Sequence, residues 1–183
     1  MKPYEYAVNA ANEVVQILLT VSADEMDAVA NRILEANAIF VAGAGRSLLM
    51  LKAFAMRLMH FGIKVHVVGE TTTPAITEKD LLIVASGSGE TATIQVITQK
   101  AAAAGAGLVM VTTNRRSSLA LIANHVILIS AGSKQDGPYS SWQPAGNSFE
   151  QSLLLILDGI AIFIAEKRGF GLERSLTRHA NLE

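Results

Sequence analysis

The stretch LLIVASGSGET, residues 81–91, decides the fold. Its first five residues are all apolar, which is typical of a buried strand in a parallel sheet. A loop of Ser and Gly follows, and a helical pattern begins directly after it. The N–H groups at a helix start are unpaired, the helix dipole is positive there, and Ser and Thr hydroxyls add donors. The loop between strand and helix therefore suits an anion.

The chemistry of this loop indicates a small phosphorylated metabolite. Without a Lys it is not a Walker A loop, and a phosphate held by amides and hydroxyls needs neither metal nor nucleotide. The alternative is an ordinary capped helix start, since Ser is a good N-cap and Glu90 suits a first turn. Two Ser, two Gly and one Thr within six residues are more than a cap needs. We expect phosphate binding by the loop residues Ser86, Gly87, Ser88 and Thr91.

Outward from this unit, short apolar runs alternate with helical patterns. Strands are expected at 38–42, 64–68, 81–85, 108–111 and 125–129, with helices after the first, third, fourth and fifth. Two helices precede them, the second starting at Ser22 with Glu25 completing a capping box. The alternation predicts an α/β three-layer sandwich, with a five-stranded parallel, doubly wound (flavodoxin-like) sheet and helices on both faces.

Length and composition define the class of protein. The 183 residues, half of them hydrophobic, predict one domain: N-terminal helices (1–37), a core sheet (38–130), and a C-terminal helix and tail (147–183). The net charge of −1 argues against nucleic acid, and the absence of Cys excludes disulfides and thiolate chemistry. No signal peptide is apparent. The most apolar segment, 152–165, carries Asp158 and is too short to span a bilayer. We expect a soluble cytoplasmic protein with no membrane contact.

A second small loop, GAGRS at 43–47, follows the first strand. Ligands of doubly wound sheets sit at the carboxyl ends of the strands, so this loop and the one at 86–91 should meet, and the loop after the second strand is a further candidate. Leu48 stands where a GxGxxG motif needs its third Gly, so a dinucleotide site is disfavoured. Two interpretations stay open: Arg46 and Ser47 contact a phosphate or sugar hydroxyls, or the loop is an ordinary turn with a solvated Arg46.

Three titratable residues are candidates for catalysis. Glu150, in the first turn of the last helix, either complements the helix dipole or presents a carboxylate at the pocket rim. His60 lies thirteen residues beyond Ser47 on one helix, roughly 20 Å along its axis, so a catalytic His60 must serve a neighbouring subunit's pocket. His179, in the polar tail, is either solvated or folds over a pocket. No His, Asp or Glu cluster has metal-ligand spacing, and we expect no metal.

Six segments together resemble a known family. They are GAGRS (43–47), FAMRLMHFG (54–62), VGETTTP (68–74), SGSGET (86–91), FE (149–150) and RHANL (178–182). The chain resembles the sugar isomerase (SIS) family of phosphosugar-binding domains. SGSGET alone is specific only for the wider family. The combination is similar to the branch that interconverts D-arabino-3-hexulose 6-phosphate and D-fructose 6-phosphate.

The resemblance implies an activity and partners. The reaction is the second step of formaldehyde fixation in the ribulose monophosphate pathway, after hexulose-phosphate synthase, the implied functional partner. The family implies a five-stranded parallel sheet between helices, a homotetramer and no cofactor. Rival hypotheses are another phosphosugar isomerase, or a non-catalytic phosphosugar sensor. Sensors usually carry a DNA-binding domain, and no basic recognition helix precedes this sheet.

The resemblance also implies site residues. Moving a carbonyl between C3 and C2 through a cis-enediol needs a base at carbon and a second group that moves protons between the oxygens. Glu150 is the expected base and His60 the expected group for proton transfer at oxygen or ring opening, and the exchange of these two roles stays open. His60 occupies the helix position where related isomerases place a catalytic carboxylate across the subunit interface, and His179 is a third candidate. Substrate-binding residues are expected to be Gly45, Arg46, Ser47, Ser86, Gly87, Ser88, Thr91, Glu70 and Thr72.

Overall fold

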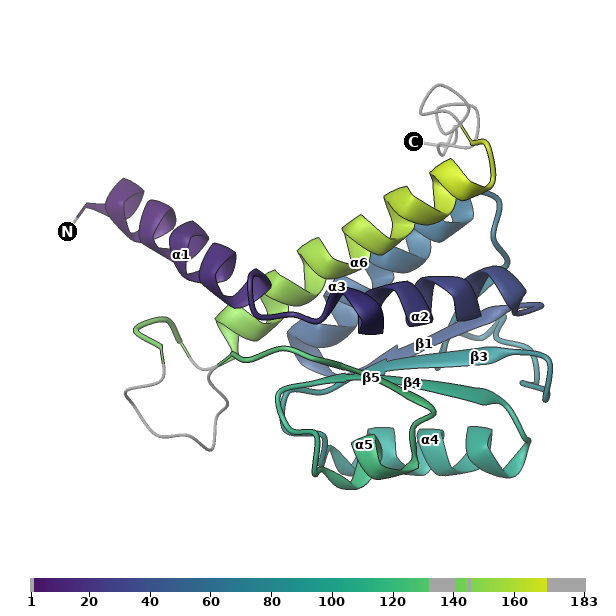
Figure 1. The fold of residues 1–183 in the computed structure, drawn as a ribbon. Helices are drawn as coiled ribbons and strands as arrows, with labels where there is room; N and C mark the ends of the chain where they lie inside the picture. The colour runs from purple at the N-terminus through teal and green to yellow at the C-terminus, as the bar shows by residue number, and fades with distance from the viewer. Residues whose placement is uncertain (1, 132–140, 145, 171–183) are drawn as a thin grey trace.

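The fold is a parallel sheet covered by helices on both faces (Figure 1). The structure is a computed structural model, which describes residues 2–131, 141–144 and 146–170. The strands are β1 (Ile39–Gly43), β2 (Val65–Val67), β3 (Leu81–Ala85), β4 (Gly107–Thr112) and β5 (His125–Leu128). All of them pair in parallel, in the order β2-β1-β3-β4-β5. This is the flavodoxin-like order. The predicted fold class is confirmed, with strand ends displaced by a residue or two.

The helices form two layers. One face of the sheet carries α2 (Ala23–Glu35), α3 (Gly45–His60) and α6 (Asn147–Lys167), and the other carries α4 (Ala92–Ala103) and α5 (Ser118–Ile122) (Figure 1). Helix α1 (Pro3–Leu18) packs on α6 and extends beyond the rest of the fold, as Figure 1 shows. The connection from β1 through α3 to β2, and from β3 through α4 to β4, gives the crossover pattern of a doubly wound sheet.

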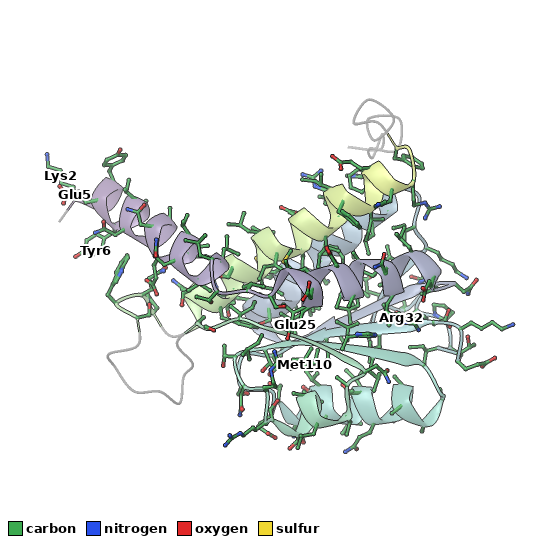
Figure 2. All side chains as sticks on the ribbon, viewed as in Figure 1. Lys2, Glu5, Tyr6, Glu25, Arg32 and Met110 are labelled. Carbon is green, nitrogen blue, oxygen red and sulfur yellow. The ribbon has the colours of Figure 1, made fainter. Side chains whose placement is uncertain are left out.

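Alternating side chains of the strands build two separate cores. In β3, Leu81 and Ile83 face α2, α3 and α6, while Leu82 and Val84 face α4 and α5. Met110 of β4, labelled in Figure 2, belongs to the second core. The strands are buried on both faces, which explains why the sequence shows continuous apolar runs instead of alternation.

Helix α6 corrects one argument made from the sequence. The helix has 21 residues and is long and apolar enough, by length and composition, to cross a membrane, so the expectation that its apolar segment is too short was wrong. More than half of its apolar window is buried inside the fold, where it packs against α1, α2 and α3. Leu153, Leu157 and Ile164 are almost completely buried. Its hydrophobicity is that of a central core helix.

The predicted capping box at Ser22 forms only in part. The Ser22 hydroxyl accepts from the Glu25 N–H at 3.3 Å, as expected of an N-cap. The reciprocal bond does not form, because the Glu25 carboxylate accepts from the Leu128 N–H at 3.1 Å and pairs with Arg115. Glu25, labelled in Figure 2, therefore fastens the start of α2 to the edge strand β5.

Asp80 fastens the turn before β3, at the end of the sheet where the strands begin. Its carboxylate accepts from the Thr77 N–H at 2.8 Å, the Thr77 hydroxyl at 2.7 Å and the Asn37 amide at 3.0 Å. Burial alone would raise the pKa of Asp80, but these hydrogen bonds outweigh it and hold the pKa below its ordinary 3.8. The charged form is therefore the one that the fold stabilises.

We expect Asp80→Asn to lower the free energy of unfolding by about 1–3 kcal/mol at neutral pH, because the amide cannot accept all three hydrogen bonds. Because the pKa of Asp80 is lower in the folded state, its contribution to the free energy of unfolding is complete above pH 3.8. That contribution is lost as the pH falls through the pKa of the folded state. Urea unfolding of both proteins at neutral pH and at successively lower pH measures this difference. The difference in free energy of unfolding between the two proteins should become smaller as the pH falls. A difference that does not change with pH would contradict this role of Asp80.

Candidate active site

A cavity of about 320 Å³ opens at the carboxyl ends of the strands. It is lined by residues 44–47 after β1, by Ala85 at the end of β3 with residues 86–88 and Thr91 after it, by Thr113 after β4, and by Gly146, Phe149 and Glu150 at the start of α6. The volume is within the range of small-molecule sites. The sheet thus brings together segments that lie about a hundred residues apart, as the doubly wound topology predicts.

Three helices begin at this cavity, and none of them has a side-chain cap. The N-caps are Ala44 for α3, Thr91 for α4 and Gly146 for α6, and no cap side chain bonds to a first-turn N–H. In contrast, α2 and α5, which do not line the cavity, are capped by Ser22 and Ser117. The positive dipole ends of the three helices therefore meet at the cavity, together with the first-turn N–H groups that have no protein acceptor; the Asn147 N–H is not one of these, since it donates to the Pro144 carbonyl at 3.0 Å.

The loop after β3 is held together by its own hydroxyls. The Ser86 and Thr91 hydroxyl oxygens lie 2.8 Å apart, and the Ser86 hydroxyl accepts from the Gly89 N–H at 3.1 Å. The Ser88 hydroxyl accepts from the Glu90 N–H at 3.2 Å. These bonds close the loop into a compact turn at the cavity end of α4, with Ser86, Ser88 and Thr91 among the residues that line the cavity.

Glu90 has a structural role. Its carboxylate accepts from the Ser118 N–H and hydroxyl, both at 2.7 Å, and from the Gln95 amide at 2.9 Å. The bond from the Ser118 N–H, followed by that from its hydroxyl, holds the pKa of Glu90 below its ordinary 4.5. Glu90 therefore joins the loop to the start of α5 and does not line the cavity.

Glu150 is the only carboxylate among the described residues that line the cavity. It stands in the first turn of α6, where only 12% of its side chain is exposed, and pairs with the Arg46 guanidinium, whose Nε donates to Glu150 Oε2. Arg46 comes from the first turn of α3 and is 55% exposed at the rim. The ion pair thus joins two of the three uncapped helix starts and fixes a carboxylate at the cavity.

The structure places His60, Glu70 and Thr72 outside the cavity lining. His60 ends α3 at the opposite end from the cavity and is buried, with 3% of its surface exposed. Glu70 and Thr72 lie in the loop after β2, outside the cavity lining, and Glu70 Oε1 is 3.4 Å from Lys52 Nζ. His179 lies outside the described residues. A role for any of these in the site remains a prediction.

Thr113 is a lining residue that sequence reasoning missed. It follows β4, whose carboxyl end carries no pattern in the sequence that predicts a pocket. A Thr just beyond a strand has no distinguishing pattern, and only the neighbouring position of β3 and β4 in the sheet brings it to the cavity. Within the described part of the chain, no group of three or more His, Cys, Asp or Glu side chains is placed to hold a metal ion.

The fold and the cavity define a doubly wound α/β domain with a small-molecule site at the carboxyl ends of its strands, and comparison with known proteins identifies its family. The SIS domain family model matches residues 32–155, and the chain belongs to this family. A Bacillus subtilis protein, 3-hexulose-6-phosphate isomerase, is 42% identical over the full length of both chains. A Mycobacterium gastri protein of the same name is 44% identical, covering 94% of this chain and 87% of its own.

Solved structures agree with these relatives. A Methanococcus jannaschii protein, whose crystal structure was used to infer a molecular function of 3-hexulose-6-phosphate isomerase, superposes with a TM-score of 0.85 at 30% identity. The superposition covers 98% of this chain and 99% of the other. An Escherichia coli protein shares the fold at 18% identity, with a TM-score of 0.81 over 98% of this chain and 100% of its own.

Proposed function

We propose that this protein is a 3-hexulose-6-phosphate isomerase, which interconverts D-arabino-3-hexulose 6-phosphate and D-fructose 6-phosphate through a cis-enediol. The observation that carries the proposal is one carboxylate, Glu150, at the rim of a cavity into which three uncapped helix starts converge. The two curated relatives of that name, similar over nearly the whole chain, support the same activity.

The proposed mechanism divides the cavity into two parts. The loop after β3 and the uncapped helix starts bind the phosphate, which fixes the unreactive end of the sugar and so positions the reacting carbons. Glu150 removes the proton from C2 of the 3-hexulose, beside the C3 carbonyl, and returns it to C3 of the enediol, while His60 of a neighbouring subunit moves the proton of the C2 hydroxyl to the C3 oxygen. Arg46 orients the carboxylate in the resting site. The reaction moves only protons, and we propose no metal or organic cofactor.

The setting of the enzyme is part of the proposal. We place it in the cytoplasm, as a homotetramer, where it acts on the product of hexulose-phosphate synthase during formaldehyde fixation in the ribulose monophosphate pathway. Exposed apolar side chains on α3 and α6, among them Leu49, Met56 and Ile162, support self-association. No membrane or nucleic acid takes part.

A coupled assay tests the activity. Ribulose 5-phosphate, formaldehyde and a hexulose-phosphate synthase supply the substrate, and glucose-6-phosphate isomerase with its NADP-linked dehydrogenase reports fructose 6-phosphate as NADPH. NADPH formation that depends on this protein and survives EDTA treatment supports the cofactor-free isomerase. A flat trace with active coupling enzymes rejects this activity and leaves another phosphosugar as the substrate.

His60 is proposed to act in the cavity of a neighbouring subunit, because α3 separates it from its own cavity by roughly 20 Å. We expect His60→Ala and Glu150→Gln to be nearly inactive alone. Mixing the two unfolded variants and refolding them together should restore activity, since about one quarter of shared sites then combine an intact Glu150 with an intact His60.

Size-exclusion chromatography must first show that both variants keep the native oligomer. Each variant refolded alone is the control. Native oligomers with no recovered activity would contradict the shared site and assign the buried His60 to packing.

A further inference from the structure

The carbonyl of Gly87, in the middle of the loop after β3, accepts three hydrogen bonds. They come from the Thr113 N–H at 3.0 Å, the Thr113 hydroxyl at 2.8 Å and the Thr112 hydroxyl at 3.0 Å. A carbonyl oxygen has two lone pairs, so three donors leave its direction little freedom. Two adjacent threonines at the end of β4 therefore bind one peptide group of the neighbouring loop, and the Thr112 hydroxyl also accepts from the Asn114 N–H at 3.2 Å.

The loop is held from both sides. The β3–β4 ladder continues past the strands, since the Ser86 N–H donates to the Val111 carbonyl at 3.1 Å before Thr113 bonds to Gly87. On the other side, a side chain at Gly87 would meet the buried Phe149 ring at 3.7 Å. The Gly87 peptide thus lies between the end of β4 and the first turn of α6.

The orientation of this carbonyl decides where the next N–H points. The peptide joining Gly87 to Ser88 is trans, so its C=O and N–H point in opposite directions. The carbonyl points to β4, hence the Ser88 N–H points away from β4, toward the β1 side of the sheet, where residues 44–47 line the cavity. No acceptor for the Ser88 N–H is found among the described residues.

We propose that Thr112 and Thr113 are positioning residues that hold the Ser88 N–H in the direction of the bound phosphate. Neither hydroxyl has to touch the substrate, because both act through the Gly87 carbonyl. Without the hydroxyls the peptide can rotate, and the phosphate loses a preoriented donor. This inference rests on the proposed phosphosugar function, but its test needs only phosphate binding.

The test compares threonine variants of equal shape. Thr113→Val keeps the volume and the backbone N–H but removes the hydroxyl, Thr112→Val does the same at its neighbour, and Thr113→Ser restores a donor. The matched control is Thr98→Val, a buried threonine of α4 whose hydroxyl donates to the Ile94 carbonyl at 2.8 Å, away from the cavity. Calorimetric titration with inorganic phosphate gives Kd, and the coupled assay gives kcat and KM.

We expect Thr113→Val to raise the Kd for phosphate, and the KM, about fivefold to tenfold with kcat nearly unchanged, as for a lost ground-state contact. Thr112→Val should raise both, the double variant should raise them more, and Thr113→Ser and Thr98→Val should resemble the wild type. A Kd within about twofold of the wild type in the double variant overturns the inference, as does an equal rise in Thr98→Val.

A measurement on the wild type covers the case in which the variants do not fold. On titration with phosphate, the amide proton resonance of Ser88 should shift downfield more than that of Gly105, which lies at the far end of α4. Saturable binding without a Ser88 shift overturns the inference, and so does a wild type that binds no phosphate. Phosphate binding with the expected shift but without turnover rejects the proposed function and leaves the inference intact.

Discussion

Glu150→Gln is expected to lower kcat by about 10²- to 10⁴-fold, the range that general acid–base groups contribute. The amide keeps the size of the carboxylate and its place in the first turn of α6, but it cannot take a proton from carbon. Because Glu150 is the only carboxylate among the described cavity residues, no described neighbour replaces it. The binding of fructose 6-phosphate should change much less, since we propose that the loop after β3 binds the phosphate.

Hydrogen exchange distinguishes a lost base from a damaged site. During turnover in D2O, an enediol mechanism exchanges the carbon-bound hydrogen of fructose 6-phosphate with solvent, and NMR follows that exchange. Glu150→Gln should slow exchange as much as it slows turnover. The control is Glu166→Gln, on the exposed side of the same helix, which should slow neither exchange nor turnover. Exchange at the wild-type rate in Glu150→Gln would mean that another group is the base.

Gly89→Ala is expected to lower the free energy of unfolding by about 2–5 kcal/mol and to abolish phosphate binding. Gly89 has a φ of +68°, which a Cβ disfavours. The new Cβ would also lie 2.0 Å from the Ser117 hydroxyl oxygen and 2.4 Å from its Cβ. Ser117 is completely buried and caps α5, so it cannot move aside without releasing that helix. The loop must shift instead, and Ser86 and Ser88 shift with it.

A second glycine isolates the steric part of this effect. Gly169, just after α6, has a φ of +65°, but a Cβ there meets nothing within 4 Å. Gly169→Ala therefore shows the conformational cost alone, about 1–2 kcal/mol. Urea unfolding of both variants and titration with inorganic phosphate give the comparison. Equal destabilisation by the two substitutions, with phosphate binding retained in Gly89→Ala, would contradict the role of the close approach to Ser117.

The sequence was sufficient to predict the fold because its signals are local. Buried parallel strands read as continuous apolar runs, and each ends at a loop whose small residues mark the helix start, so the five strands and their parallel order followed from periodicity and chain order. The wrong expectation that the apolar segment of α6 is too short to span a bilayer also came from a local signal. Apolar length is a property of a segment, whereas burial of that segment against α1, α2 and α3 depends on the whole fold.

The cavity was predicted only where its residues carry a local pattern. The loops at 43–47 and 86–91 and the first turn of α6 meet as expected. Thr113 and the pairing of Arg46 with Glu150 were not predicted, because both depend on which strands and helices become neighbours. Glu25 shows the converse: a local capping pattern is overridden by a strand about a hundred residues away.

The three uncapped helix starts also link substrate binding to the stability of the folded protein. Their positive ends line one cavity, where the first-turn N–H groups that have no protein acceptor are placed to bind an anion. Phosphosugar binds the folded chain alone, since these helix starts are brought together only by folding, and a ligand at about a hundred times its Kd adds about 2.7 kcal/mol to the free energy of unfolding. The concentration of its metabolite in the cell would thus govern how long each copy of the enzyme escapes unfolding and proteolysis.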